Sequence, residues 1–326
     1  MNFLSLDIFK PKFPLQALEI SGKYVLGIRL EKTKTETILE HFFCDPLPEG
    51  MLDVSMVKQN IGKAEQFLTF MGPKLDGFAE KKRRLSLILP DIIAKVSVLE
   101  FDRLPSKRAE VEDLIKWKLK KAIPFKVEEG KIVFRKIMSG DGSGMKTSLL
   151  VATIRNTVLE QYEKIFGQLN FHPGLIDLSS FNVMNLCRHL KPEIMGEPEN
   201  YLFLNIAENY YTISILKRGN LLFYRAKVVR GDSVSTEDLF MRALDRDFFP
   251  TLVYFQDKLQ GGEIKRIFLR NFHFQGDALK AFMEERFHIP VDYVDPAGLV
   301  KPQPSLAVNF SDFQRMAPLL GAVLAR

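Results

Sequence analysis

Features that mark membrane-spanning or secreted proteins are missing from this sequence of 326 residues. No apolar run approaches the ~18 consecutive residues from which a transmembrane helix is predicted. The first residues carry no basic region ahead of a long apolar stretch, so no secretory signal peptide is predicted. The only two cysteines, Cys44 and Cys187, show no spacing pattern and are interpreted as small apolar side chains in a reducing compartment. We therefore expect a cytoplasmic protein.

Motifs that carry chemistry are scarce as well. The five histidines show no metal-binding spacing, and the Gly/Ser-rich segment 139–144 lacks the Lys-Ser/Thr pair of a phosphate-binding loop. No nucleic-acid motif is present, and a net charge of +6 is too small to imply nucleic acid by itself. The positive excess fits solubility, or attraction to an anionic lipid surface or an acidic partner. We expect no metal site and no nucleic-acid partner.

What is present is a run of strong strand patterns at 201–229, around which the chain is organised. Its first strand has apolar residues at nearly every position up to Ile206, which is typical of a strand buried on both faces. A second alternating strand follows over 211–215, and the polar turn 217–220 returns the chain along 221–229. These spacings predict a three-stranded meander.

A weaker copy of this pattern lies near the N-terminus, at 17–30. Both copies have a strand, a short polar break and a second strand, and the polar residue before the break is Glu19 in one copy and Asn205 in the other. Two copies that are 205 − 19 = 186 residues apart suggest two related halves that face a cleft. This arrangement is typical of an actin-like ATPase fold, in which each half offers such an element to the phosphates of a nucleotide. The alternative is two unrelated hairpins.

Hydrophobic periodicity predicts helices elsewhere in the chain. Ser55 is expected to cap a helix over 56–71, which the following Gly-Pro pair ends. A capping box that begins at Ser235 is expected to start a long amphipathic segment that Pro250 kinks or interrupts. A helix rich in small residues is expected over 317–325.

Five segments carry a resemblance to a known family: the leader with FKPK at 9–12 just before ALEI at 17–20, LSLILPDIIAKV, EDLIKWKLKKAIPF, LLVATIRNTVLEQYEKIFGQLNFHPGLIDLSSF and FFPTLVYFQDKLQGGEIKRIFL. By their order and spacing, the chain resembles over nearly its whole length the PilM family of type IV pilus assembly proteins, which is related to FtsA and to the cytoplasmic part of GspL. The resemblance implies an α/β fold of actin-like (ribonuclease H-like) duplicated domains with an inserted small α+β subdomain. It places the first half at 1–98, the inserted subdomain at 99–176, and the second half with a C-terminal helix at 177–326.

The chain departs from the family pattern at all three turns that would contact a nucleotide. The aligned residues of the two phosphate turns are Glu19, Ser21 and Gly22 in the first, and Asn205, Ala207 and Thr212 in the second. The family usually has Asp-Ile-Gly at each of these turns, and glycine lets backbone N–H groups approach a phosphate more readily than Ser or Ala does. Asn is also a poorer ligand for Mg²⁺ than Asp. Glu208 would add negative charge, and Phe272 and Phe274 would crowd an adenine.

These six residues are therefore interpreted as a vestigial nucleotide cleft. We expect nucleotide to bind weakly or not at all, no catalytic residue, and a pseudo-ATPase rather than an enzyme. The resemblance allows ATP and Mg²⁺ as cofactors, but the altered phosphate turns speak against them. The alternative is an active ATP-binding ATPase whose nucleotide state switches partner binding, with Glu19, Asp91 and Glu208 holding a metal.

The resemblance further implies a non-enzymatic scaffold that is peripheral to the inner membrane. Such a protein would bind the N-terminal cytoplasmic tail of a PilN-like membrane protein and link it to the pilus motor ATPase or platform proteins. In the family the tail enters a groove between the first half and the inserted subdomain. The residues expected near it are Lys95, Val96, Val98, Trp117 and Phe125, and the alternative for the apolar ones is ordinary core. The leader 1–14 is expected to pack on its own domain or to touch a membrane interface.

Overall fold

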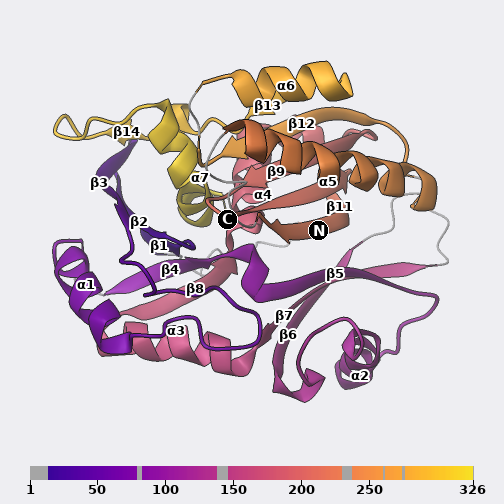
Figure 1. Cartoon of the computed structure of the whole chain (residues 1–326), viewed down its shortest axis with the longest axis horizontal. Helices are drawn as coiled ribbons and strands as arrows, with labels where there is room; N and C mark the ends of the chain where they lie inside the picture. Colours follow the sequence, from indigo (N-terminus) through magenta and orange to yellow (C-terminus); the bar gives the residue numbers. More distant parts are fainter. Residues whose placement is uncertain are drawn as a thin grey trace, which may run out of the picture.

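The computed structural model describes residues 14–78, 83–137, 146–229, 237–259, 261–273 and 276–325. Within these ranges the chain forms a mixed α/β structure with three β-sheets (Figure 1). The predictions for the leader, for segment 139–144, for the cap at Ser235 and for Phe274 lie outside the described residues. No helix in the described ranges is long and apolar enough to cross a bilayer.

The first large sheet has six strands in the order β14-β3-β2-β1-β4-β8. These strands are β1 (Gln16–Ile20), β2 (Tyr24–Lys32), β3 (Thr37–Pro46), β4 (Arg84–Leu89), β8 (His172–Leu178) and β14 (Lys301–Pro302). The first three form an antiparallel meander, and β4 and β8 run parallel to β1. All of β1 is buried because apolar clusters cover both faces of the sheet, with Ala17 in one cluster and Leu18 in the other.

The second large sheet repeats this arrangement with five strands in the order β11-β10-β9-β12-β13. These strands are β9 (Asn200–Ile206), β10 (Tyr210–Lys217), β11 (Asn220–Val228), β12 (Ile264–Asn271) and β13 (Val291–Tyr293). Again the first three form an antiparallel meander, and the last two run parallel to its first strand. Glu19 lies in the first strand of one meander and Asn205 in the first strand of the other. The internal repeat predicted from the sequence is therefore confirmed.

A third, smaller sheet is formed by the segment between β4 and β8. It consists of β5 (Ala94–Phe101), β7 (Thr147–Arg155) and β6 (Gly130–Ile137), in that spatial order and all antiparallel. One face is covered by α2 (Arg108–Leu119), and the two share a separate apolar core. Figure 1 shows α2 at the lower right, projecting from the body of the molecule beside β6. The domain boundaries at 98 and 176 stay predictions; β5 extends across the first position and β8 across the second.

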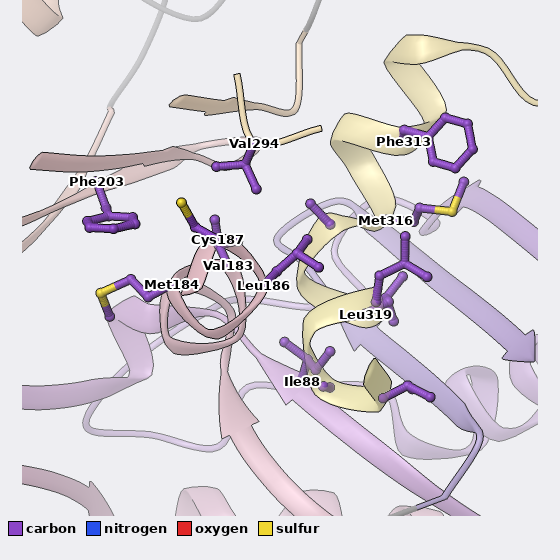
Figure 2. Packing of buried hydrophobic residues seen from close by; sticks show 14 of the residues in the cluster. Ile88, Val183, Met184, Leu186, Cys187, Phe203, Val294, Phe313, Met316 and Leu319 are labelled. Carbon is purple, nitrogen blue, oxygen red and sulfur yellow. The ribbon is translucent and has the colours of Figure 1, made fainter. Parts of the chain in front are cut away.

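Helices pack on the large sheets and between them. One face of the six-stranded sheet is covered by α1 (Ala64–Asp76) and α3 (Asn156–Gln168), and the five-stranded sheet is covered by α5 (Glu237–Lys258) and α6 (Ala278–Phe287). Between the two sheets, α4 (Ser179–Leu190) packs against α7 (Phe310–Leu324). Figure 2 shows side chains of both helices in one cluster with Ile88 of β4 and Phe203 of β9. This shared core joins the two halves.

The crossing of α4 and α7 is close because α7 has a glycine at the contact. A Cβ atom at Gly321 would lie 2.0 Å from the carbonyl oxygen of Asn182. The start of α7 is fixed by a capping box, in which the Asn309 side chain accepts from the N–H of Asp312 and the Asp312 side chain accepts from the N–H of Asn309. The helix therefore begins at Phe310, whereas the sequence-based prediction placed its start at 317.

The start of α1 also differs from the prediction. Ser55 does not cap a helix over 56–71; its Oγ accepts from the N–H groups two and three residues later in a local turn, and the helix begins at Ala64. The chain at 60–61 is instead held by Gln161 of α3, whose side-chain oxygen accepts from both N–H groups. A side chain about a hundred residues away thus replaces the helical hydrogen bonds that the local pattern predicts.

Candidate functional site

The turns that follow β1 and β9 contact each other between the two large sheets. The first turn is 21–23 and the second is 207–209. The backbone N–H of Lys23 donates to Oε2 of Glu208 over 2.8 Å. Gly22 lies under the same carboxylate, because a Cβ atom there would be 2.7 Å from Oε2 of Glu208. A carboxylate of the second turn therefore binds the backbone of the first turn.

A histidine holds the second turn from another strand. Nε2 of His273, which lies just after β12, donates to the backbone oxygen of Glu208 over 2.7 Å. Burial lowers the pKa of His273, so the neutral ring is favoured. Burial raises the pKa of Glu208, and the hydrogen bond from the Lys23 N–H and the charge of Lys23 offset part of this rise. The second turn is thus bound to both halves of the molecule.

A buried arginine lies between the first strands of the two meanders. Arg270 of β12 is the register partner of Asn205 and is fully buried. Its guanidinium donates to Oδ1 of Asn205 at 3.2 Å and to three backbone carbonyls, those of Ile206 at 3.1 Å, Gln314 at 2.8 Å and Arg315 at 2.9 Å. The last two carbonyls belong to α7. One side chain therefore ties the five-stranded sheet to the helix between the halves.

Glu19 and Asn205, which precede the turns 21–23 and 207–209, both lie beside the Arg270 guanidinium. Oε2 of Glu19 lies 3.9 Å from Nη2 of Arg270, and Oδ1 of Asn205 accepts from Nη1 of the same guanidinium. Burial raises the pKa of Glu19, while Arg270 and a hydrogen bond with Ser179 offset part of that rise. Because an arginine keeps its proton in proteins, the buried site holds one fixed positive charge. The structure thus brings the two repeat positions to a single cation.

Five of the six residues of the predicted cleft lie at the ends of β1 and β9 or in the turns that follow: Glu19, Ser21 and Gly22 in the first half, and Asn205 and Ala207 at the matching places in the second. The sixth, Thr212, lies on β10 as the register partner of Asn205. Every one except Gly22 is buried. Sequence reasoning missed the role of Arg270, although an arginine directly after the buried apolar run 267–269 was an available signal.

An aromatic ring fills the turn at which the sequence predicts the adenine end. Phe272 is buried, and its ring centroid lies 5.3 Å from that of Tyr24 in the other half. The guanidinium groups of Arg270 and Arg315 lie 5.4 Å and 5.6 Å from the same centroid. At these distances each cation interacts favourably with the face of the ring. The ring therefore packs between two arginines and the first half.

A second buried carboxylate joins the halves. Asp91, just after β4, accepts from the N–H and the hydroxyl of Ser180 at the start of α4. It also accepts from the hydroxyls of Tyr210 at 3.1 Å and Tyr224 at 2.8 Å, which belong to the five-stranded sheet. Burial raises the pKa of Asp91, and these four donors offset part of the rise. Protein donors thus satisfy this carboxylate.

The residues present do not fit a nucleotide with Mg²⁺. The backbone N–H of Lys23, which a phosphate at the first turn would use, already donates to the Glu208 carboxylate. A phosphate there would also be repelled by the negative charge of that carboxylate. A divalent cation beside Glu19 and Asn205 would meet the guanidinium of Arg270. In the part of the chain that the structure describes, no group of three or more His, Cys, Asp or Glu could hold a metal ion.

The five predicted partner-binding residues do not share one surface. Val96 is buried in the core beneath the six-stranded sheet, and Val98 packs against the core between the halves. Phe125 packs in the core under α2, and Lys95 is half-buried on β5. Trp117 points outward from α2 with 72% of its surface exposed.

A groove of about 370 Å³ lies between the small sheet and the six-stranded sheet. Apolar residues of both sheets, α3 and α4 line it, among them Val133, Ala152, Leu159, Ile176 and Phe181. A second hollow of about 660 Å³ shares Lys131 and Val133 with the groove and continues across β6 to Lys116 of α2. Sequence reasoning missed Val133, which is 56% exposed. Its position between Lys131 and Arg135, on the charged side of an alternating strand, was the available signal.

Comparisons with known proteins relate the chain to one family and one fold. A family model described as type IV pilus assembly protein PilM matches residues 17–246. A solved structure described as a PilM-PilN type IV pilus biogenesis complex is 17% identical, has a TM-score of 0.72, and covers 96% of this chain and 98% of its own. A Bacteroides thetaiotaomicron protein described as having an actin-like ATPase fold and unknown function is 10% identical, with a TM-score of 0.51 and coverage of 96% and 98%. No match to a curated protein sequence was found. The predicted actin-like α/β fold is confirmed.

Proposed function

This chain belongs to the PilM family of type IV pilus assembly proteins, and we propose that it is a non-enzymatic cytoplasmic scaffold that binds the N-terminal tail of a PilN-like inner-membrane protein. The observation that carries the proposal is the apolar groove between the small sheet and the six-stranded sheet. The relative described as a PilM-PilN complex supports a PilN-like chain as the partner.

The groove has the chemistry that an extended peptide needs. Its walls are mainly apolar, and burial of one Val or Leu side chain there contributes about 1.5–3 kcal/mol, so a few anchors give substantial affinity. β6 is an edge strand of its sheet, and the described residues leave its outer row of backbone groups without a strand partner. An added strand would use those groups for affinity and the pockets for specificity. Lys131 and Glu163, which also line the groove, would fix the direction of the tail by charge.

The pseudo-ATPase part of the proposal rests on the contact between the two turns. Glu208 uses the backbone N–H of Lys23, and the Arg270 guanidinium lies between Glu19 and Asn205. The first contact replaces a phosphate and the second replaces a cation, so the halves hold each other without a nucleotide. This favours a permanent scaffold over the alternative of a nucleotide switch.

Tail binding is tested with a fluorescent peptide that carries the first dozen or so residues of the PilN-like partner. Val133→Asp places a charge in the groove without removing a core side chain, because Val133 is largely exposed. We expect the dissociation constant of the peptide to rise at least tenfold, since the variant loses an apolar contact and buries a charge.

Val57→Asp is the matched control, because Val57 is also exposed but does not line the groove. It should bind the peptide like the wild type. Equal affinity of the peptide for wild type and Val133→Asp would reject the groove, and no binding of any tail peptide to the wild type would reject the scaffold.

We extend the proposal to the pilus motor ATPase or platform proteins as further partners, and to a place beside the inner membrane. A scaffold that holds the tail of a membrane protein must lie within reach of that membrane. Co-purification of the motor ATPase with the wild type, but not with Val133→Asp, would support a link that passes through the tail.

A further inference from the structure

The small-sheet subdomain, taken here as residues 94–155 from β5 to β7, carries a net charge equal to that of the whole chain. Residues 94–155 contain 14 Lys and Arg and 8 Asp and Glu, so their balance of 14 − 8 = +6 equals the +6 of all 326 residues. The remainder of the chain is therefore neutral in sum. An anionic surface would attract the molecule by this subdomain and orient it.

Trp117, the single tryptophan of the chain, lies on α2 within this positively charged segment. Trp117 lies on the side of α2 away from its buried residues Val111, Ile115 and Leu119, and 72% of its surface is exposed. Large apolar side chains usually avoid such a position, and the indole ring is the one that combines an apolar body with a polar N–H. The exposed ring is thus free to contact a partner.

Three exposed lysines follow the tryptophan in the chain, at the C-terminal end of α2 and in the loop after it. Lys120, Lys121 and Lys126 are exposed, and no ion pair joins any of them to an acidic residue within the described ranges. The acidic residues of α2 lie nearer its start, where Glu110 and Glu112 pair with Lys107 and Arg108. We call Trp117, Lys120, Lys121 and Lys126 the α2 face.

We propose that the α2 face docks on an anionic lipid surface. Tryptophan is enriched at the level of lipid headgroups, where its ring sits between the acyl chains and water. Lysines beside it would reach the headgroup phosphates with flexible apolar stems that remain in contact with the surface. The cations are lysines rather than arginines, which suits attraction to many mobile phosphates more than fixed two-point pairing with the carboxylates of an acidic protein.

The position of the α2 face relative to the groove favours the same surface. The hollow that crosses β6 runs from the groove to Lys116, the neighbour of Trp117 in sequence. Under the proposed function, the tail of a membrane-anchored partner occupies the groove, so α2, which borders the hollow through Arg108, Glu112 and Lys116, lies near the bilayer. The lipid contact itself is a property of this chain alone and requires no tail.

The single tryptophan makes the test direct, because its fluorescence reports on the α2 face alone. The full chain, without any tail peptide, is titrated with vesicles of phosphatidylcholine plus phosphatidylglycerol and with vesicles of phosphatidylcholine only. We expect a blue shift of the emission and co-flotation with the anionic vesicles, and neither with the neutral ones. The shift should shrink as salt is added, because salt screens exposed charges.

Variants separate this face from general charge attraction. The triple substitution Lys120→Gln, Lys121→Gln, Lys126→Gln should weaken partition into anionic vesicles on the order of a hundredfold. A control triple, Lys32→Gln, Lys34→Gln, Lys63→Gln, removes the same charge from exposed positions in the first half and should partition nearly as the wild type does.

Equal loss in the two triples would overturn the proposal, as would an emission that anionic vesicles leave unchanged. A blue shift with polyglutamate but not with vesicles would assign the α2 face to an acidic protein instead. Each of these outcomes is independent of peptide binding in the groove, so failure of the lipid contact and failure of the scaffold proposal are distinguishable.

Discussion

Lys23 and Glu208 lie 185 positions apart in the chain, yet the backbone N–H of the lysine donates to the carboxylate of the glutamate over 2.8 Å. In the sequence, Glu208 is an unfavourable charge beside two phosphate turns. In the fold, it accepts the hydrogen bond that a phosphate would accept. A side chain of the second half is therefore hydrogen-bonded to the backbone of the first turn.

The first prediction concerns ATP. We expect millimolar ATP with Mg²⁺ to leave the thermal unfolding midpoint unchanged, because Glu208 and Arg270 already use the groups that a nucleotide would need. A ligand at a hundred times its dissociation constant would add about 2.7 kcal/mol, a shift of a few degrees for a chain of this size. A clear midpoint shift that depends on Mg²⁺ would restore the nucleotide switch to the proposed function.

The second prediction concerns pH and uses Glu208→Gln. The amide oxygen still accepts from Lys23, but the charge is gone. Because burial raises the pKa of Glu208 in the folded state above its ordinary 4.5, the folded wild type binds more protons than the unfolded chain as pH rises past that value. The wild type therefore loses stability through this window, and the variant does not.

Thermal midpoints of the two proteins, measured from acid to neutral pH, check this sign. The midpoint of the variant should rise relative to that of the wild type as pH increases, and the difference should level off above the folded pKa. A difference that is constant with pH would contradict the burial of the carboxylate.

The third prediction concerns the buried arginine. Arg270→Met removes hydrogen bonds to Asn205 and three carbonyls and leaves Glu19 buried beside an apolar side chain. We expect a loss of about 3–5 kcal/mol in the free energy of unfolding, measured with urea. Adding Glu19→Gln should recover part of the loss, because the unpaired buried charge is then removed.

Arg266→Met is the matched control on the same strand. Arg266 pairs with Asp292 at 2.7 Å, but both side chains are more than a third exposed. Such a pair contributes about 0.2–1 kcal/mol, so this variant should unfold nearly like the wild type. Comparable losses in the free energy of unfolding for the two variants would show that the buried Arg270 stabilises the fold no more than the exposed Arg266 does.

The two arginines illustrate which structural features could be predicted from the sequence and which could not. The meander at 201–229 and its copy at 17–30 are local patterns with a period of two residues, so the repeat was predictable from them. The actin-like fold was predicted from the resemblance to the PilM family. The hydrogen-bond partners of Arg270 come from positions 44 to 65 residues away, and no local period encodes them. The prediction that Ser55 caps a helix was wrong for the same reason, because the following chain is held by Gln161 of α3, which is distant in sequence.

Proline positions were also only partly predictable. Pro73 was expected to end a helix, but it lies within α1, and Pro250 lies within the continuous α5. In both helices apolar residues on one face pack on a sheet, and this tertiary packing outweighs the local preference against proline.

The fourth prediction concerns the contact of α4 and α7. Gly321→Ala would place a Cβ atom 2.0 Å from the carbonyl oxygen of Asn182, so the helices must move apart. We expect a loss of about 1–3 kcal/mol or more in the free energy of unfolding from this overpacking. Gly167→Ala in α3 is the control, because no neighbouring atom lies within 4 Å of the new Cβ.

The control should gain up to about 1 kcal/mol, since alanine is the better helix former. Opposite signs for the two glycine variants, measured by urea unfolding, are the expected result. A stabilised Gly321→Ala would contradict the close approach of α4 to α7.

The position of α7 in the chain has a consequence for synthesis. β14 and α7 follow nearly every other described element, yet β14 pairs with β3 and α7 packs on β1, β2 and β4 of the sheet that is made first. During synthesis, one apolar face of that sheet stays without α7 until residues 310–324 have been made. The core between the halves therefore cannot be completed by residues of the first half alone. Folding of the first half is in this way coupled to that of the second.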